Sequence, residues 1–68
     1  MHTSYLVTGM TCQHCVHAVS EEVGAVSGVD EVRVDLDSGR LTVVSSDDVP
    51  FSTIEAAVDE AGYTVAPA

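Results

Sequence analysis

The chain is organised around the stretch Gly9-Met10-Thr11-Cys12-Gln13-His14-Cys15. It opens with a glycine, contains a C-x-x-C pair, and stands between a β-like segment and a segment with helical periodicity. Two cysteines three positions apart at the start of a helix can direct both sulfurs to one point. Backbone N–H groups and the positive end of the helix dipole favour the thiolate forms there. We therefore predict that this loop is the functional centre of the chain.

The segments on both sides of the loop predict a strand followed by a helix. Residues 4–8 are rich in β-branched and aromatic side chains and predict a strand that ends at Gly9. Beyond the cysteines, valines recur at steps of three, four and three, which predicts one apolar stripe of a helix that ends at Ser27-Gly28. Valine is a poor helix former, so packing must favour this helix more than propensity does. The stripe comprises Val16, Val19, Val23 and Val26.

The middle of the chain predicts a β-hairpin. Residues 32–36 alternate apolar and polar side chains, which is the period of a strand with one buried face. Residues 37–39 form a turn signal that ends in a glycine, and residues 40–44 predict the returning strand.

A second helix follows a polar connection at residues 45–48. Pro50 suits the first turn of that helix, whereas Ser52 with Glu55 would form a capping box, so the start of the helix is open by about two residues. Gly62 is expected to end the helix. Its apolar stripe comprises Phe51, Ile54, Val58 and Ala61.

Residues 63–65 predict a short last strand, residues 66–68 a frayed end, and His2 part of a mobile terminus. The order strand, helix, strand, strand, helix, strand predicts an α+β fold of the ferredoxin-like βαββαβ type. Such a fold is an open-faced sandwich, with a four-stranded antiparallel sheet and both helices on one face. We expect residues 1–68 to form a single domain.

The charge balance excludes some partners. Eleven carboxylates face two arginines and no lysine, for a formal net charge of −9. Nucleic acid and anionic membranes would repel such a surface, whereas a basic protein surface would be attracted to it. The chain has neither a long apolar run nor the basic, apolar start of a signal peptide, so we expect a cytoplasmic protein.

In a reducing compartment, two cysteines favour a metal or redox pair over a structural disulfide. Two soft thiolates with few other ligands suit Cu(I) better than Zn(II), which prefers four ligands. His14 and His17 are close in sequence, but they crowd into the same turn as the cysteines, so a zinc site looks incomplete. A thioredoxin-type site would usually have an aromatic residue where Thr11 stands. No constellation of general acid, base and nucleophile is visible, so we do not expect an enzyme.

The stretch from Gly9 to Cys15 resembles the G-M-T-C-x-x-C signature of the heavy-metal-associated domain family. The similarity extends over the whole chain, including Gly28-Val29 and residues 60–63. The family includes cytoplasmic Cu(I) chaperones and amino-terminal domains of copper-transporting P-type ATPases. The resemblance implies that Cys12 and Cys15 hold Cu(I) close to linear and pass it to a partner by ligand exchange.

The resemblance also suggests four residues that support or tune the site. Met10 would point into the core beneath the loop, and Tyr63 stands where bacterial members place a tyrosine near the metal. Thr11 replaces the acidic residue that zinc-exporting relatives commonly carry before the first cysteine. His14 departs from the small neutral residues usual at its position. It could hydrogen-bond a sulfur, act as a weak ligand, shift the thiol pKa values, or simply be solvated.

Several functional interpretations remain open at this stage. The first is a freestanding chaperone that delivers copper to a P-type ATPase, and to a copper-sensing repressor as a second partner. Met1 close to the first strand and the Ala-Pro-Ala end favour it modestly over an excised ATPase domain. A zinc or mercury binder and a small dithiol oxidoreductase are further alternatives. We expect a monomer without metal and a copper-bridged dimer as a further state.

Overall fold

The computed structural model describes residues 2–68, so the expectation that rests on Met1 lies outside the described residues. Six elements follow one another in the predicted order strand, helix, strand, strand, helix, strand. They are β1 (His2–Thr8), α1 (Gln13–Gly24), β2 (Val29–Asp35), β3 (Arg40–Ser45), α2 (Phe51–Glu60) and β4 (Thr64–Pro67).

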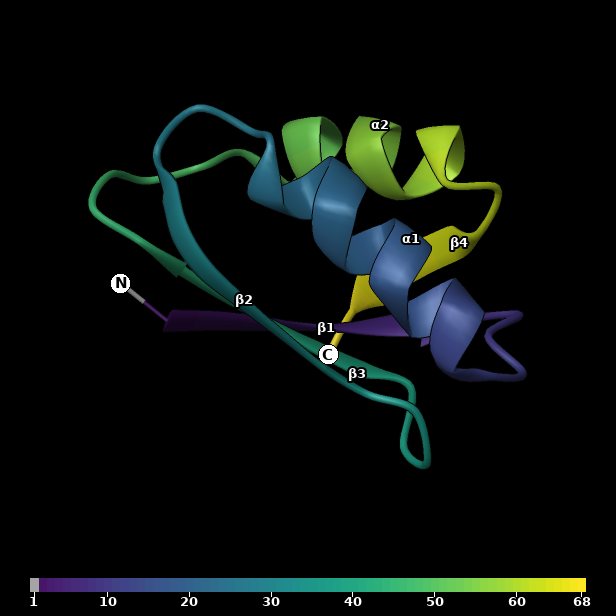
Figure 1. Cartoon of the computed structure of the whole chain (residues 1–68). Coiled ribbons are helices and arrows are strands. Elements are labelled where there is room, and N and C mark those ends of the chain that lie inside the picture. Colours follow the sequence, from purple (N-terminus) through teal and green to yellow (C-terminus); the bar gives the residue numbers. More distant parts are fainter. Residues whose placement is uncertain (1) are drawn as a thin grey trace.

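The sheet has the strand order β2-β3-β1-β4, and every neighbouring pair is antiparallel. Each helix therefore connects two strands that are parallel to each other and separated by a third. Both helices cover the same face of the sheet, and the other face is open (Figure 1). The predicted ferredoxin-like α+β sandwich is confirmed.

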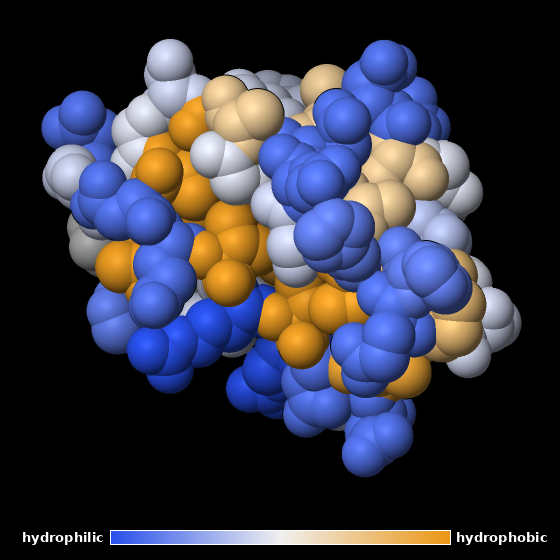
Figure 2. All heavy atoms as spheres, viewed as in Figure 1, coloured by the Kyte–Doolittle hydropathy of each residue, from blue (hydrophilic) through white to orange (hydrophobic). Residues whose placement is uncertain are grey.

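Branched aliphatic side chains fill the space between the helices and the sheet. The predicted stripe residues Val19 and Val23 of α1 and Ile54 and Val58 of α2 are fully buried, as is Leu41 of β3. Each such side chain contributes roughly 1.5–3 kcal/mol by leaving water. Figure 2 shows apolar atoms between the hydrophilic side chains of the face in view, as expected where partly buried hydrophobic residues surround the core.

The prediction for the end of α1 was wrong. The helix ends at Gly24; the N–H of Ala25 donates to the carbonyl of Glu21, and the N–H of Val26 donates to the carbonyl of Val23. Val26 lies beyond the helix but still packs against the core. The apolar period continued past the helix because the turn that follows folds back onto the same core.

The bounds of the hairpin also differ from the prediction. β2 begins at Val29, three residues early, and ends at Asp35, so Leu36 lies in the turn. A β-bulge between Val29 and Glu31 shifts the register against β3. The bulge interrupts the alternation of buried and exposed side chains. A search for strict alternation therefore places the start of β2 too late in the sequence.

Both ends of the chain are more ordered than predicted. His2 is not part of a mobile terminus but pairs with Val44 in β1. β4 spans residues 64–67 rather than 63–65, and Pro67 pairs with Tyr5, so the expectation of a frayed end was wrong. The neighbouring strands provide these pairings, and local sequence does not reveal them.

The start of α2 lies within the predicted range and is closer to the alternative at Pro50 than to the capping box. Pro50 is the N-cap, one position before the helix, and Phe51 is the first helical residue. No side chain caps this end, so the capping box between Ser52 and Glu55 does not form. The ring of Phe51 packs against Tyr5 at a centroid distance of 5.7 Å, which anchors the first turn to β1.

Three connections lie at one end of the molecule, among them the β2–β3 turn, whose Gly39 carbonyl accepts the N–H of Val7. The β1–α1 loop and the α2–β4 connection lie at the same end, on the opposite side from the loops that lead into β2 and α2 (Figure 1). Within residues 2–68, neither helix has the length and apolar character needed to cross a membrane.

The hairpin turn is attached to the last part of β1 through a glycine. Gly39 adopts a φ of 72°, its N–H donates to Asp35, and its carbonyl accepts the N–H of Val7 at 2.7 Å. A Cβ at Gly39 would lie 2.8 Å from the carbonyl oxygen of Val7. Gly62 has a similar positive φ of 94°, but nothing lies within 4 Å of a Cβ placed there.

We predict that Gly39→Ala destabilises the domain more than Gly62→Ala. Both variants should lose about 1–2 kcal/mol because of the left-handed backbone. Only Gly39→Ala also forces the turn away from the backbone of Val7. Urea unfolding of the reduced, metal-free protein measures both losses, and equal losses would contradict this role of Gly39.

Candidate metal centre

The loop that carries the cysteines turns directly from β1 into α1. Gly9 has a φ of 99°, which reverses the chain after β1. Cys12 is the N-cap of α1 in an extended conformation, and the N–H of Cys15 donates to its carbonyl at 3.1 Å. Both cysteines therefore lie in the first turn of the helix, where the dipole favours negative charge. No acidic side chain occupies this turn.

The two sulfurs are close together and accessible. Their separation is 3.7 Å, both thiols are free, and Cys12 is exposed while Cys15 is half-buried. For metal–sulfur bonds of about 2.3 Å, two thiolates lie about 3.8 Å apart around a tetrahedral ion and about 4.6 Å apart in line. The observed spacing thus suits a bent pair, and a linear pair would require the sulfurs to separate further.

The two sulfurs are the thiolate donors of this site. In the described part of the chain, no three His, Cys, Asp or Glu side chains are grouped so that they could hold a metal ion. An ion held by Cys12 and Cys15 would keep open coordination positions on the solvent side, where Cys12 is exposed.

The surroundings of Cys15 lower the pKa of its thiol from the ordinary 9.0 to about 6. The largest cause is a hydrogen bond from the backbone of Thr11, followed by one from the hydroxyl of Tyr63. Smaller contributions come from the backbone and the thiol of Cys12, and partial burial acts in the opposite direction. The Thr11 hydroxyl is also 3.8 Å from the sulfur of Cys15. Cys15 is therefore largely a thiolate at neutral pH.

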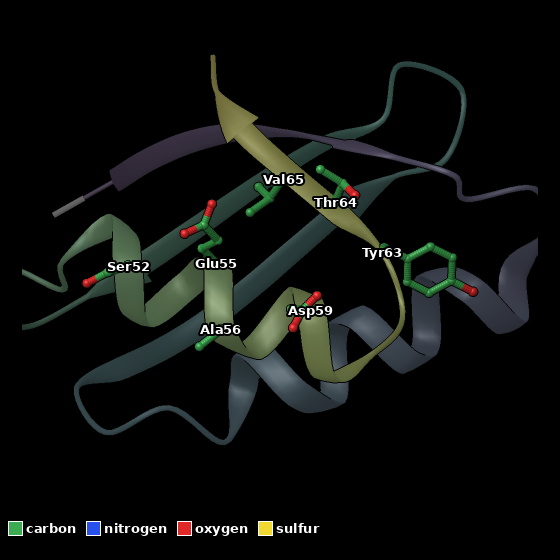
Figure 3. Close-up of a pocket in the computed structure, with 7 residues that line it drawn as sticks. All are labelled: Ser52, Glu55, Ala56, Asp59, Tyr63, Thr64 and Val65. Atoms are coloured by element: carbon green, nitrogen blue, oxygen red, sulfur yellow. The ribbon is translucent and has the colours of Figure 1, made fainter.

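Tyr63 reaches the thiol loop from the α2–β4 connection. It lies just before β4, and its N–H donates to the carbonyl of Val58 at 3.1 Å. The ring extends beyond the start of β4 toward α1 (Figure 3). The hydrogen bond to Cys15 is the largest cause that raises the pKa of the Tyr63 hydroxyl; burial and the charges of the two thiolates add to it.

Gly9 makes room for this ring. A Cβ at Gly9 would lie 3.3 Å from Cδ1 of Tyr63. From the sequence, Gly9 was expected only to open the loop, and Thr11 was considered only for its side chain. The approach of the Tyr63 ring to Gly9 and the hydrogen bond from the Thr11 backbone to Cys15 were not predicted. The Gly62-Tyr63 pair was the sequence signal for the approach of the ring.

The other predicted residues lie in different surroundings. Met10 is half-buried and packs against the core beneath the loop. His14 is exposed on the first turn of α1 and, within residues 2–68, its side chain makes no hydrogen bond or ion pair. His17 is also exposed and pairs with Glu21 at 2.9 Å. The structure thus brings Thr11 and Tyr63 to the sulfur of Cys15, but not His14.

The chain is a ferredoxin-like domain with two free cysteines at the start of its first helix. Residues 4–64 match the heavy-metal-associated domain, and the chain belongs to this family. It is 44% identical over 61 residues to the copper chaperone CopZ of Bacillus subtilis, with 88% of each chain covered.

Two further relatives show the range of the family. A probable copper-exporting P-type ATPase of Archaeoglobus fulgidus is 37% identical over 67 residues, which cover 96% of this chain but 8% of the ATPase. A solved structure of a CopZ metallochaperone is 32% identical and superposes with a TM-score of 0.89 over 96% of this chain and 98% of that one. Chaperones and transport ATPases thus share this domain.

We predict that Tyr63→Phe raises the pKa of Cys15 from about 6 toward its usual value, because a hydrogen-bond donor to the thiolate is lost. The rate of alkylation of Cys15 by iodoacetamide should fall as the pH drops through about 6 in the parent protein. In the variant this inflection should move to higher pH. Fragmentation mass spectrometry assigns the label to Cys15.

Tyr5→Phe is the matched control, because Tyr5 is buried in the core and packs against Phe51. An unchanged inflection in Tyr63→Phe would contradict the assignment.

The lowered pKa of Cys15 also makes the free energy of unfolding depend on pH. The thiol ionises more readily in the folded chain, so its contribution is fully present above pH 9.0 and is lost as the pH falls to about 6.

Proposed function

We propose that this protein is a carrier of Cu(I), which it binds as cargo between the thiolates of Cys12 and Cys15. The single observation that supports this most is the pair of free sulfurs, 3.7 Å apart, with no third His, Cys, Asp or Glu grouped beside them in residues 2–68. Soft thiolates in low number favour Cu(I) over Zn(II), which prefers four ligands. The copper chaperone CopZ of Bacillus subtilis is a relative over most of the chain.

The proposed transfer is a ligand exchange rather than catalysis. A thiolate of the partner enters an open coordination position before Cys12 or Cys15 leaves, so the ion is never released into water. The low pKa of Cys15 keeps that ligand deprotonated without a base, and the exposed Cys12 is accessible to the partner. No covalent bond of a substrate is formed or broken.

We assign the partner as a copper-transporting P-type ATPase, with a copper-sensing repressor as a second recipient. The cytoplasm is the proposed location, with a monomer in the metal-free state and a copper-bridged pair as a further state. A domain of such an ATPase is the second candidate function, which the similarity to the Archaeoglobus protein favours. The higher identity to CopZ, over most of both chains, favours the carrier.

A reading frame that continued into membrane-spanning segments would favour the ATPase domain. Zinc and mercury remain the alternative cargoes. A zinc site would need donors beyond the cysteine pair, and His14 and His17 are the nearest candidates by sequence.

We predict that the reduced protein takes up one Cu(I) per chain in anaerobic competition with a chromogenic chelator. Cys12→Ser and Cys15→Ser should each lose more than about 100-fold in affinity, because changes outside the ligands already cost about 10–100-fold. Zn(II) titrated in parallel should bind much more weakly. Strong binding of Zn(II) beside weak binding of Cu(I) would contradict the proposed cargo.

We predict that His14→Gln keeps Cu(I) affinity within about tenfold of the parent, less than the loss expected for a ligand. His14 is exposed and makes no hydrogen bond to either sulfur in the described structure. His17→Gln is the matched control, since it changes the same residue type one turn further along α1. Complete loss of Cu(I) binding in His14→Gln alone would show that this histidine is required.

A further inference from the structure

A groove runs between α2 and β4 beside the thiol loop. Its volume is about 270 Å³, and it is lined by Glu55 and Asp59 from α2 and by Thr64 and Val65 from β4. Tyr63 lies at the end nearest the thiol loop (Figure 3). The groove is smaller than the roughly 300–1,000 Å³ usual for small-molecule sites. Its size suits one or two side chains of another protein.

The carboxylates of this groove have no counter-charge in the described chain. Glu55 and Asp59 are exposed, and within residues 2–68 their side chains make no ion pair or hydrogen bond. The two arginines of the protein lie in the β2–β3 hairpin, and Arg33 there pairs with Glu31 at 3.1 Å. A cation that neutralises the groove must therefore come from a partner.

The strand that borders the groove is an edge of the sheet. In the order β2-β3-β1-β4, β4 pairs with β1 and has no strand on its other side. Edge strands present unpaired N–H and C=O groups that can accept an added strand. Pro67 lacks an N–H, so the usable edge is the stretch of residues 64–66.

The spacing of the two carboxylates matches an extended cationic segment. Residues four apart on a helix rise by about 6 Å along its axis. Alternate side chains of a strand point to one side and are about 6.6–6.8 Å apart. Two lysines or arginines at alternate positions of a strand can thus pair with Glu55 and Asp59 together.

We propose that the α2–β4 groove docks an extended, lysine- or arginine-bearing segment of a partner protein. The segment adds to the free edge of β4 and directs its basic side chains to Glu55 and Asp59. This docking does not depend on metal, yet it places the partner next to Tyr63, whose ring contacts Gly9 of the thiol loop. Main-chain pairing provides affinity and the two carboxylates provide selectivity.

The test is a titration of the metal-free, reduced, ¹⁵N-labelled protein with a short blocked peptide of alternating lysine and valine at low salt. We expect saturable chemical-shift changes at residues 55, 59 and 64–66. Glu55→Gln combined with Asp59→Asn should weaken binding at least tenfold. The matched control, Glu22→Gln with Asp48→Asn, removes the same two charges elsewhere and should change the affinity less than twofold.

Two further peptides separate charge from strand pairing. A peptide of alternating glutamate and valine should not bind, and a lysine–valine peptide methylated at alternate backbone nitrogens should bind at least tenfold more weakly. Equal losses in the two double variants would overturn the proposal, since net charge alone would then explain binding. Absence of binding, or saturable shifts confined to α1 or the open sheet face, would overturn it as well. Because the titration uses metal-free protein, none of these outcomes tests Cu(I) binding, which the separate Cu(I) titration measures.

Discussion

The buried contact between the two helices and the sheet is the constraint on which the thiol site depends. Val19 and Val23 of α1 are fully buried, and they fix the rotation of that helix about its axis. That rotation directs the first turn, with Cys12 and Cys15, toward solvent at one end of the molecule. No side chain caps the start of α1. The position of the cysteines therefore depends on the packing of Val19, which lies about one helical turn after Cys15.

The thiol chemistry arises mainly from the backbone and from one distant side chain. The Thr11 backbone and the Tyr63 hydroxyl stabilise the Cys15 thiolate, and only the first is close to Cys15 in sequence. Tyr63 can approach because Gly9 has no side chain and because α2 ends just before it. A change in the length of α2 would therefore alter the thiol, although α2 contributes no ligand to it.

The element order and most of the core could be predicted because side-chain periodicity records which face is buried. The bounds at His2, Gly24 and Pro67 could not, because they depend on pairing and folding back that no local pattern encodes. For the site, the cysteines, Met10 and Tyr63 were apparent from the motif and the resemblance. The backbone of Thr11 as a donor was not, since every residue carries the same N–H and only the fold decides which ones face a sulfur.

Positive and negative side chains are distributed unequally over the elements of the fold. Both arginines lie in the β2–β3 hairpin, where they face four carboxylates, whereas the other seven carboxylates have no arginine or lysine near them in the sequence. At physiological salt, fields from exposed charges fade within about 8 Å, so the hairpin cannot neutralise carboxylates on distant elements. The carboxylates on the two helices therefore keep their negative charge without compensation from the hairpin.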